Sequence, residues 1–203
     1  MTKLLHVIGS PMQELSFSRR VGEAFVAAWA ARNPDGEVDT LDLWGTDLPD
    51  FDKTASAGKF KAARGIEHTE EEAAAWAKVS AVAKHFASAD RFVLSCGMWN
   101  FGLPYRVKQY IDVIVQPHIT FDPKAYAGMV TGKPMQLVLA SGGVYEDGAA
   151  NDFVLPYLQT ILAFIGITDV GVLRVGGTAG PPEKTGPLLD DAIARAEAAA
   201  ASF

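Results

Sequence analysis

The sequence predicts an α/β protein with a five-stranded, doubly wound parallel sheet in the order 2-1-3-4-5 and helices on both faces. Five short apolar runs alternate along the chain with five helical patterns. Strands that alternate with helices form parallel sheets covered on both sides, and right-handed crossovers leave few topologies. A length of 203 residues fits one domain, which we expect to span 1–203.

The predicted strands are runs of about six residues that end in Gly, Ser or Pro, and the helices carry recognisable end signals. Ser18 is positioned to cap the first helix, Thr69 and Glu72 form a capping box, and Gly166 closes the fourth helix. The strands are 3–8, 37–43, 91–95, 134–140 and 169–175; the helices are 19–32, 69–88, 104–115, 153–165 and 187–202. Segments 44–67 and 116–132 have no regular pattern, so we expect irregular structure there.

Charge and composition exclude several function classes. A net charge of −6 offers no basic stripe for nucleic acid, and the longest apolar runs have only strand length, which argues against a membrane span. The single cysteine excludes an internal disulfide and fits a reducing compartment. We therefore expect a cytoplasmic protein.

Few residues suggest metal or nucleophile chemistry. No set of His, Cys, Asp and Glu has the spacing of metal ligands, so we predict no metal site. Cys96 ends a buried strand without a neighbouring base, and His6 lies inside the first strand. Both are interpreted as packed core residues.

Three loops share the carboxyl edge of the predicted sheet, where ligands of open α/β sheets bind. The first loop, 9–18, carries the hydroxyls of Ser10, Ser16 and Ser18 at a helix start, which suits phosphate. It lacks the glycine fingerprint of dinucleotide sites and the Gly-Lys of a P-loop. Simple capping by Ser18, with Ser10 and Ser16 in solvent, explains the pattern equally well.

The second and third loops add an aromatic surface and bare backbone. Residues 98–101 provide a Met, two aromatic rings and an amide, which suit a planar ring, and residues 141–145 allow close backbone approach before the hydroxyl of Tyr145. Packing or a tight turn explains each loop alone. A phosphate cradle, a ring platform and bare backbone on one edge together indicate a site for flavin mononucleotide (FMN).

Five sequence stretches strengthen this interpretation: Ser16-Phe17-Ser18, Met98-Trp99-Asn100-Phe101, Thr131-Gly132-Lys133, Gly142-Gly143, and 156–170. Through them the chain resembles, over nearly its full length, the FMN-dependent NADH-azoreductases, also described as NADH:quinone oxidoreductases, of the flavodoxin-like superfamily. The resemblance implies a flavodoxin-like three-layer sandwich and a homodimer with two FMN sites near the subunit interface. It also implies two-electron ping-pong transfer from NADH or NADPH to quinones and azo compounds.

The resemblance assigns contacts to particular residues. The phosphate would be held by the first loop, with Phe17 acting through its backbone, the ring would lie on the second loop, and the third would close the opposite edge. The cofactor residues predicted in this way are Ser10, Ser16, Phe17, Ser18, Met98, Trp99, Asn100, Phe101, Ser141, Gly142, Gly143 and Tyr145. No catalytic acid or base is required, although Tyr145 could orient the acceptor.

This chain departs from the family at three places. Gly97 stands where the family usually has Pro, Trp99 where it commonly has Tyr, and Ser141 where it commonly has Arg. Because Ser141 lacks the positive charge of that arginine, we expect weaker contacts with the flavin or the acceptor at this position. The segment 44–60 could cover a partner's site in a dimer or pack within its own subunit.

Two other functions fit the same cradle. One is a flavodoxin-like one-electron carrier and the other is a flavin-binding regulator without turnover. Such carriers are typically smaller and more acidic than −6 over 203 residues, which favours the enzyme.

Overall fold

The computed structural model describes residues 1–203 and contains a five-stranded parallel sheet. Its strand order is β2-β1-β3-β6-β7, so the predicted order of the five sheet strands is confirmed. The strands are β1 (Lys3–Ile8), β2 (Glu37–Asp42), β3 (Arg91–Gly97), β6 (Met135–Ala140) and β7 (Val170–Val175). The switch in strand order between β1 and β3 marks the edge where ligands of this architecture bind.

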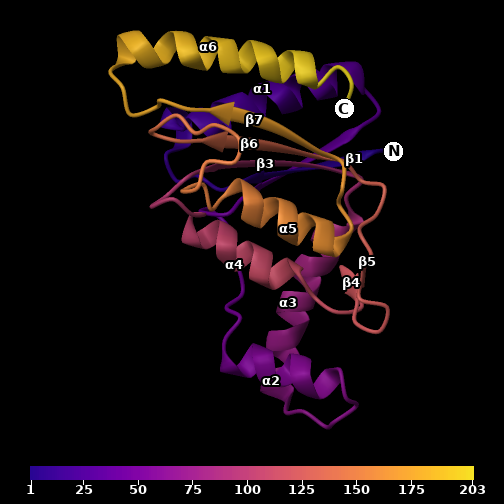
Figure 1. Cartoon of the computed structure of the whole chain (residues 1–203). Helices are drawn as coiled ribbons and strands as arrows, with labels where there is room; N and C mark the ends of the chain where they lie inside the picture. Colours follow the sequence, from indigo (N-terminus) through magenta and orange to yellow (C-terminus); the bar gives the residue numbers. More distant parts are fainter.

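Helices cover both faces of the sheet, which gives three layers (Figure 1). One face carries α1 (Phe17–Arg32) and α6 (Pro182–Ala199). The other carries α3 (Glu70–Ser88), α4 (Tyr105–Ile114) and α5 (Leu155–Ile165). The capping box of Thr69 and Glu72 at the start of α3 is confirmed, as is the left-handed Gly166 that ends α5.

The sheet separates two hydrophobic cores. On the α1/α6 side, the fully buried Phe25 and Trp29 pack with residues of α6 and of the central strands. On the other side, Phe86 of α3 stacks on Phe92 of β3 with ring centroids 4.5 Å apart. Central strands buried on both faces explain why these segments read as continuous apolar runs.

Two segments expected to be irregular contain short elements. Within 44–67 lies α2 (Lys53–Ala62), whose first turn is capped by Asp52, and within 116–132 lies a hairpin of β4 (Phe121–Asp122) and β5 (Ala127–Gly128). The helix α2 projects from the body of the molecule beside α3 (Figure 1). Its Gly58 lies so close to the α3 backbone that tertiary contact, rather than sequence pattern, accounts for this helix.

Three helix boundaries differ from the prediction. The cap of α1 is Ser16, not Ser18, because Ser16 has extended backbone and its Oγ accepts a hydrogen bond from Arg19 N. Helix α5 begins at Leu155. Helix α6 begins at Pro182, a position that favours proline, and contains Pro187, whose missing N–H removes one intrahelical hydrogen bond.

A short 3-10 helix, η1 (Gln13–Leu15), lies between β1 and α1. None of the helices combines the length and the apolar composition needed to cross a bilayer.

Candidate flavin site at the carboxyl edge of the sheet

The three loops singled out in the sequence lie at one edge of the sheet and are joined by backbone hydrogen bonds. Gly9 N donates to Ser95 O at 2.8 Å, which ties the first loop to β3. Met98 N donates to Ala140 O at 2.8 Å, and Phe153 N donates to Phe101 O at 3.1 Å. The ring loop (residues 97–102) is therefore held on both sides by the chain around the third loop.

The hydroxyls of the first loop are buried. Ser10, Ser16 and Ser18 are at most 7% exposed, so the alternative that leaves Ser10 and Ser16 in solvent is wrong. Ser16 Oγ and Ser18 Oγ lie 3.2 Å apart, and Ser10 Oγ accepts from Met12 N at 3.4 Å. A pair of buried hydroxyls at a helix N-terminus forms a compact polar cluster suited to an anion.

Backbone N–H groups contribute positive potential at this helix end. The N–H groups of Phe17 and Ser18 stand in the first turn of α1, where no intrahelical acceptor exists. Arg19 is already engaged, since its Nε donates to Glu23 at 2.8 Å and its Nη1 lies 3.5 Å from Asp42. A bound phosphate would therefore be recognised by N–H and O–H donors.

The ring loop has an unusual backbone. Asn100 and Phe101 have φ values of 48° and 67°, in the left-handed region that residues other than glycine rarely adopt. Reciprocal hydrogen bonds of 2.9 Å between the backbones of Trp99 and Gly102 close this tight turn. Strain of this kind concentrates at binding sites.

The turn presents its side chains outward. Trp99 is 39% and Phe101 49% exposed, and the amide of exposed Asn100 makes no hydrogen bond within the chain. Met98, by contrast, is partly buried against the core. The loop thus offers two aromatic surfaces and a free amide beside one packed thioether.

The third loop brings bare backbone to the same edge. Gly142 and Gly143 are exposed, while Gly143 O accepts from Ser141 Oγ at 2.8 Å and from Gly177 N at 3.1 Å. The ring of half-buried Tyr145 folds back over Gly143, and its hydroxyl has no hydrogen-bond partner within the chain. Ser141 is thus a loop-closing residue here.

The chain that follows the third loop is anchored by Arg174, a residue that the sequence analysis missed. Its Nη2 donates to the buried carboxylate of Asp152 at 2.7 Å, and its Nε donates to Asp147 at 3.2 Å. Burial alone would raise the pKa of Asp152, but the Arg174 pair and the N–H groups of Val154 and Leu155 hold it below its usual value. No sequence signal links 152 to 174, because only the fold brings them together.

His6 and Cys96 are core residues, as predicted. His6 Nε2 and Ser95 Oγ are hydrogen-bonded at 2.8 Å inside the protein, and burial, with a smaller effect of Arg19, lowers the pKa of His6 to about 4. Burial raises the pKa of the Cys96 thiol to about 12, so it is not a reactive thiolate.

These features fit FMN. A buried hydroxyl pair and free N–H groups match a phosphate, while exposed aromatic rings, the unpaired Asn100 amide and bare glycine backbone match a planar, polar-edged ring. Trp44 begins the segment 44–60, for which the sequence left open either covering a partner's site or packing within its own subunit, and here its indole Nε1 donates to Gly9 O of the same chain at 3.2 Å beside this site.

The strand order β2-β1-β3-β6-β7, with a candidate binding site at the point where that order reverses, defines a doubly wound α/β protein of the flavodoxin-like class. Residues 2–200 match the model of the Flavodoxin_2 family, described as having a flavodoxin-like fold, and the chain belongs to this family.

Relatives of similar length carry enzyme names. The chain is 37% identical over 183 residues to an FMN-dependent NADH:quinone oxidoreductase of Desulfotalea psychrophila, covering 88% of this chain and 86% of that protein. It is also 37% identical over 209 residues to a protein of the same name from Nitratidesulfovibrio vulgaris (strain DP4), covering all of both chains.

Two solved azoreductase structures are also similar to this chain. An azoreductase from Bacillus anthracis strain Sterne superimposes over both full chains with a TM-score of 0.88 and 30% identity. An FMN-dependent NADH-azoreductase from B. anthracis strain Ames Ancestor, solved in complex with FMN, gives a TM-score of 0.89 at 26% identity over 100% of this chain and 99% of that one.

Proposed function

We propose that this chain is an FMN-dependent NADH:quinone oxidoreductase that also reduces azo compounds. The observation that carries the proposal is the meeting, at one sheet edge, of buried phosphate-type donors with an exposed aromatic turn. The FMN-dependent quinone and azo reductases among its relatives support it.

The first loop would hold the phosphate. The Ser16 and Ser18 hydroxyls and the first N–H groups of α1, including that of Phe17, converge at the helix N-terminus, with Ser10 at the entrance to the loop. Because Arg19 is paired with carboxylates, these neutral donors would supply the recognition.

The ring loop and the third loop would hold the isoalloxazine. FMN, when bound, accepts a hydride from NADH or NADPH and delivers two electrons to the acceptor. Residues 98–101 would support the ring and Asn100 its polar edge, while Gly142 and Gly143 would let backbone approach the other edge and Tyr145 would orient the acceptor. No residue needs to act as a strong acid or base.

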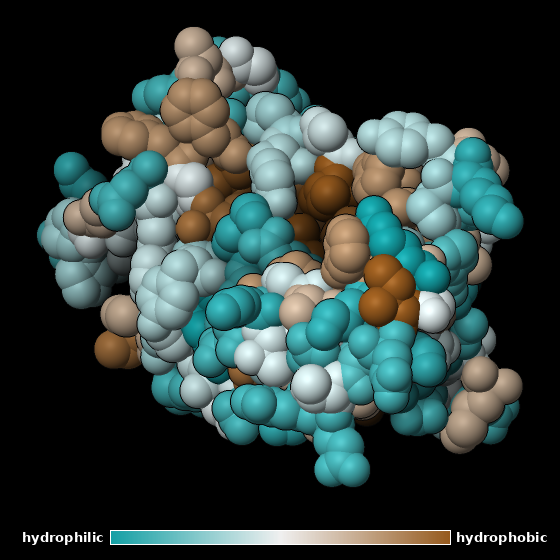
Figure 2. Space-filling model, turned by 90° about the horizontal axis from the view of Figure 1, so that it is seen from below, coloured by the Kyte–Doolittle hydropathy of each residue, from teal (hydrophilic) through white to brown (hydrophobic).

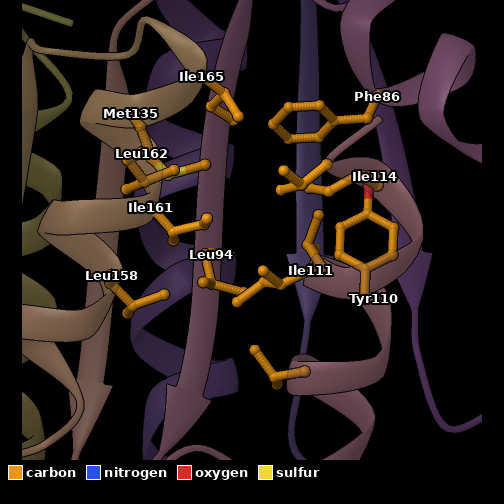
Figure 3. Close-up of a pocket in the computed structure, with 13 residues that line it drawn as sticks. Phe86, Leu94, Tyr110, Ile111, Ile114, Met135, Leu158, Ile161, Leu162 and Ile165 are labelled. Carbon is orange, nitrogen blue, oxygen red and sulfur yellow. The ribbon is translucent and has the colours of Figure 1, made fainter. Parts of the chain in front are cut away.

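We also propose a homodimer. An apolar cavity of about 30 Å³, lined only by hydrophobic residues, lies between α4 and α5 on the sheet, with Leu94, Ile111 and Leu158 among the side chains that line it (Figure 3). Seen from the α2 side, hydrophobic patches lie in a hollow of a largely hydrophilic surface (Figure 2). The cavity itself is internal, because most of the side chains that line it are buried, so a second copy would cover exposed apolar side chains outside it, such as Phe60 of α2, which is 52% exposed.

A single domain over residues 1–203 and a cytoplasmic setting complete the proposal. One sheet unites elements from residue 3 to residue 175, and Cys96 is buried and unpaired.

The visible spectrum of the purified protein, followed by anaerobic addition of NADH and then of benzoquinone, tests the function. We expect a yellow protein, or one that takes up added FMN, which NADH bleaches and the quinone recolours. Steady NADH oxidation with a small quinone distinguishes the enzyme from a one-electron carrier.

Two outcomes would contradict the proposed enzyme activity. A protein that takes up no FMN contradicts the proposal, and bound flavin that NADH does not bleach would indicate a regulator. NADPH in parallel with NADH determines the donor preference.

A further inference from the structure

Trp44 occupies a position between the first loop and the ring loop, although it lies in neither. Its indole Nε1 donates to Gly9 O at 3.2 Å, and its ring lies 5.7 Å from that of Trp99 at an interplanar angle of 40°. Tyr105 completes an aromatic cluster, edge-on to Trp44 at 5.2 Å and 6.4 Å from Trp99. Trp44 is therefore the one side chain of this cluster that contacts both loops.

The turn that carries Trp44 is fixed from several directions. Trp44 N donates to Asp42 Oδ1 at 2.9 Å, and Thr46 Oγ1 donates to Asp42 O at 2.6 Å. Arg106 of α4 donates to Leu43 O at 2.9 Å and to Thr46 O. The indole thus stands on a braced backbone, unlike a surface tryptophan on a free loop.

The ring loop needs such external support. Gly97, at its start, brings no side chain to anchor the loop, and the left-handed backbones of Asn100 and Phe101 are intrinsically disfavoured. Trp99 is the ring-loop side chain that meets the cluster, and it is also the residue at which this chain departs from the tyrosine common in its family.

We propose that Trp44 is a positioning residue that sets the orientation of Trp99 and couples the ring loop to the phosphate loop. This inference rests on the proposed function, because the two loops meet opposite ends of FMN. Trp44 acts through Trp99 and Gly9, so its loss should weaken FMN binding without removing any direct cofactor contact.

A double-mutant cycle tests the proposal. The dissociation constant of FMN is measured by flavin fluorescence for wild type, Trp44→Leu, Trp99→Leu and the double variant. We expect Trp44→Leu to weaken binding about tenfold, in line with the loss of an aromatic contact and a hydrogen bond. Because Trp44 acts in part through Trp99, the combined loss of affinity in the double variant should be clearly smaller than the product of the two single losses, and the loss that remains should reflect the contact with Gly9. Full additivity of the two losses would overturn the proposal.

A milder variant and a matched control distinguish a specific loss of affinity from a general folding defect. Trp44→Phe keeps an aromatic ring and should lose about threefold in affinity. Trp76→Phe makes the same exchange on α3, in a separate small cluster beneath α2, and should leave affinity unchanged. FMN affinity that is the same in wild type, Trp44→Leu and Trp44→Phe would refute the positioning role even if the enzyme proves active.

The FMN-free protein provides a second readout that does not depend on the proposed function. Two indoles at 5.7 Å and 40° couple their transitions, so the circular dichroism of the FMN-free protein should contain an indole couplet. Trp44→Phe and Trp99→Phe should each abolish this couplet, and Trp76→Phe should keep it. A wild type that shows the couplet but takes up no FMN would refute the function and the role of Trp44 in it, while confirming the contact; a couplet that survives both substitutions would refute the contact itself.

Discussion

The two faces of the sheet are completed in different ways. On the α1/α6 side, the helices pack against each other and close a core around Phe25 and Trp29. On the α3/α4/α5 side, the core is larger, yet α4 and α5 flank an apolar cavity (Figure 3). We refer to these as the closed face and the open face.

The difference indicates a division of labour between the faces. The closed face supports α1, whose N-terminus carries the phosphate-type donors, and it contains the neutral His6–Ser95 pair. The open face carries the charged Arg174–Asp152 pair, and α2, which packs on α3 of this face, carries the exposed side chain of Phe60. Both cores should therefore stabilise the isolated chain, and assembly should depend on the open face.

The largest effect is expected from overpacking the closed face at Gly22. A methyl group there would collide with Ser95 Oγ and come within 2.9 Å of His6 Nε2, both of which are held in the central strands. We expect Gly22→Ala to lower the free energy of unfolding by about 3 kcal/mol. Gly186→Ala on α6, where a Cβ meets nothing within 4 Å, should be neutral or stabilising in the same urea titration. Equal stability of the two variants would contradict a tightly closed face.

Acid should destabilise the closed face through His6. The pKa of His6 is about 4 in the folded chain against an ordinary 6.5, so below pH 6.5 the unfolded chain binds a proton that the folded chain does not. The free energy of unfolding should therefore fall by about 3 kcal/mol between pH 6.5 and pH 4 from this group. His6→Gln should remove this part of the pH dependence and the exposed His68→Gln should not. The prediction fails if both variants keep the wild-type slope.

A smaller loss is expected on the open face from Arg174→Gln. This change leaves the buried Asp152 carboxylate without its cation, although two backbone N–H groups still donate to it. We expect a loss of about 2 kcal/mol, together with weaker order in the loop that carries Tyr145. Arg195→Gln breaks an exposed ion pair on α6 and should cost about 0.5 kcal/mol or less. A similar cost for both would mean that the Arg174 pair is not structurally important.

The smallest effect on the chain itself, but the clearest effect on assembly, is expected at Phe60. This side chain of α2 is 52% exposed, so replacing it costs the single chain little. A charge there opposes burial by a second copy, so light scattering should show a dimer for wild type and a monomer for Phe60→Asp. Gln159→Asp, at an exposed position of α5, should remain dimeric. A monomeric wild type would contradict the proposed homodimer.

The order of the five sheet strands could be predicted because local pattern and general chain topology agree. Continuous apolar runs such as 92–94 are typical of parallel strands that are buried on both faces, and the capping box at Thr69 and Glu72 is a local signal that needs no tertiary information. The three loops at the carboxyl edge follow from that order. The burial of Ser10 and Ser16, by contrast, depends on packing that no local pattern reports.

The remaining features depend on contacts between distant parts of the chain. Helix α2 packs on α3 through the close approach of Gly58. Asp152 forms an ion pair with Arg174, which lies 22 residues further along the chain. The sequence around His85 gives no sign of a contact, yet its Nε2 lies 2.7 Å from Oδ2 of Asp39 in β2. Trp44 appears in sequence as an aromatic at the start of an irregular segment, and only the fold places it beside Trp99.

Gly97 has a consequence for how binding energy is distributed at this site. The nearest atoms to a Cβ at this position lie 3.7 to 3.9 Å away, so the space admits a side chain, yet glycine ends β3 at the start of the ring loop. Fixing the backbone of a glycine removes more conformational freedom than fixing that of any other residue. Part of the free energy of binding a ring would therefore be used to order the loop. The ring loop would also adapt its shape to different rings more easily than a loop that began with proline.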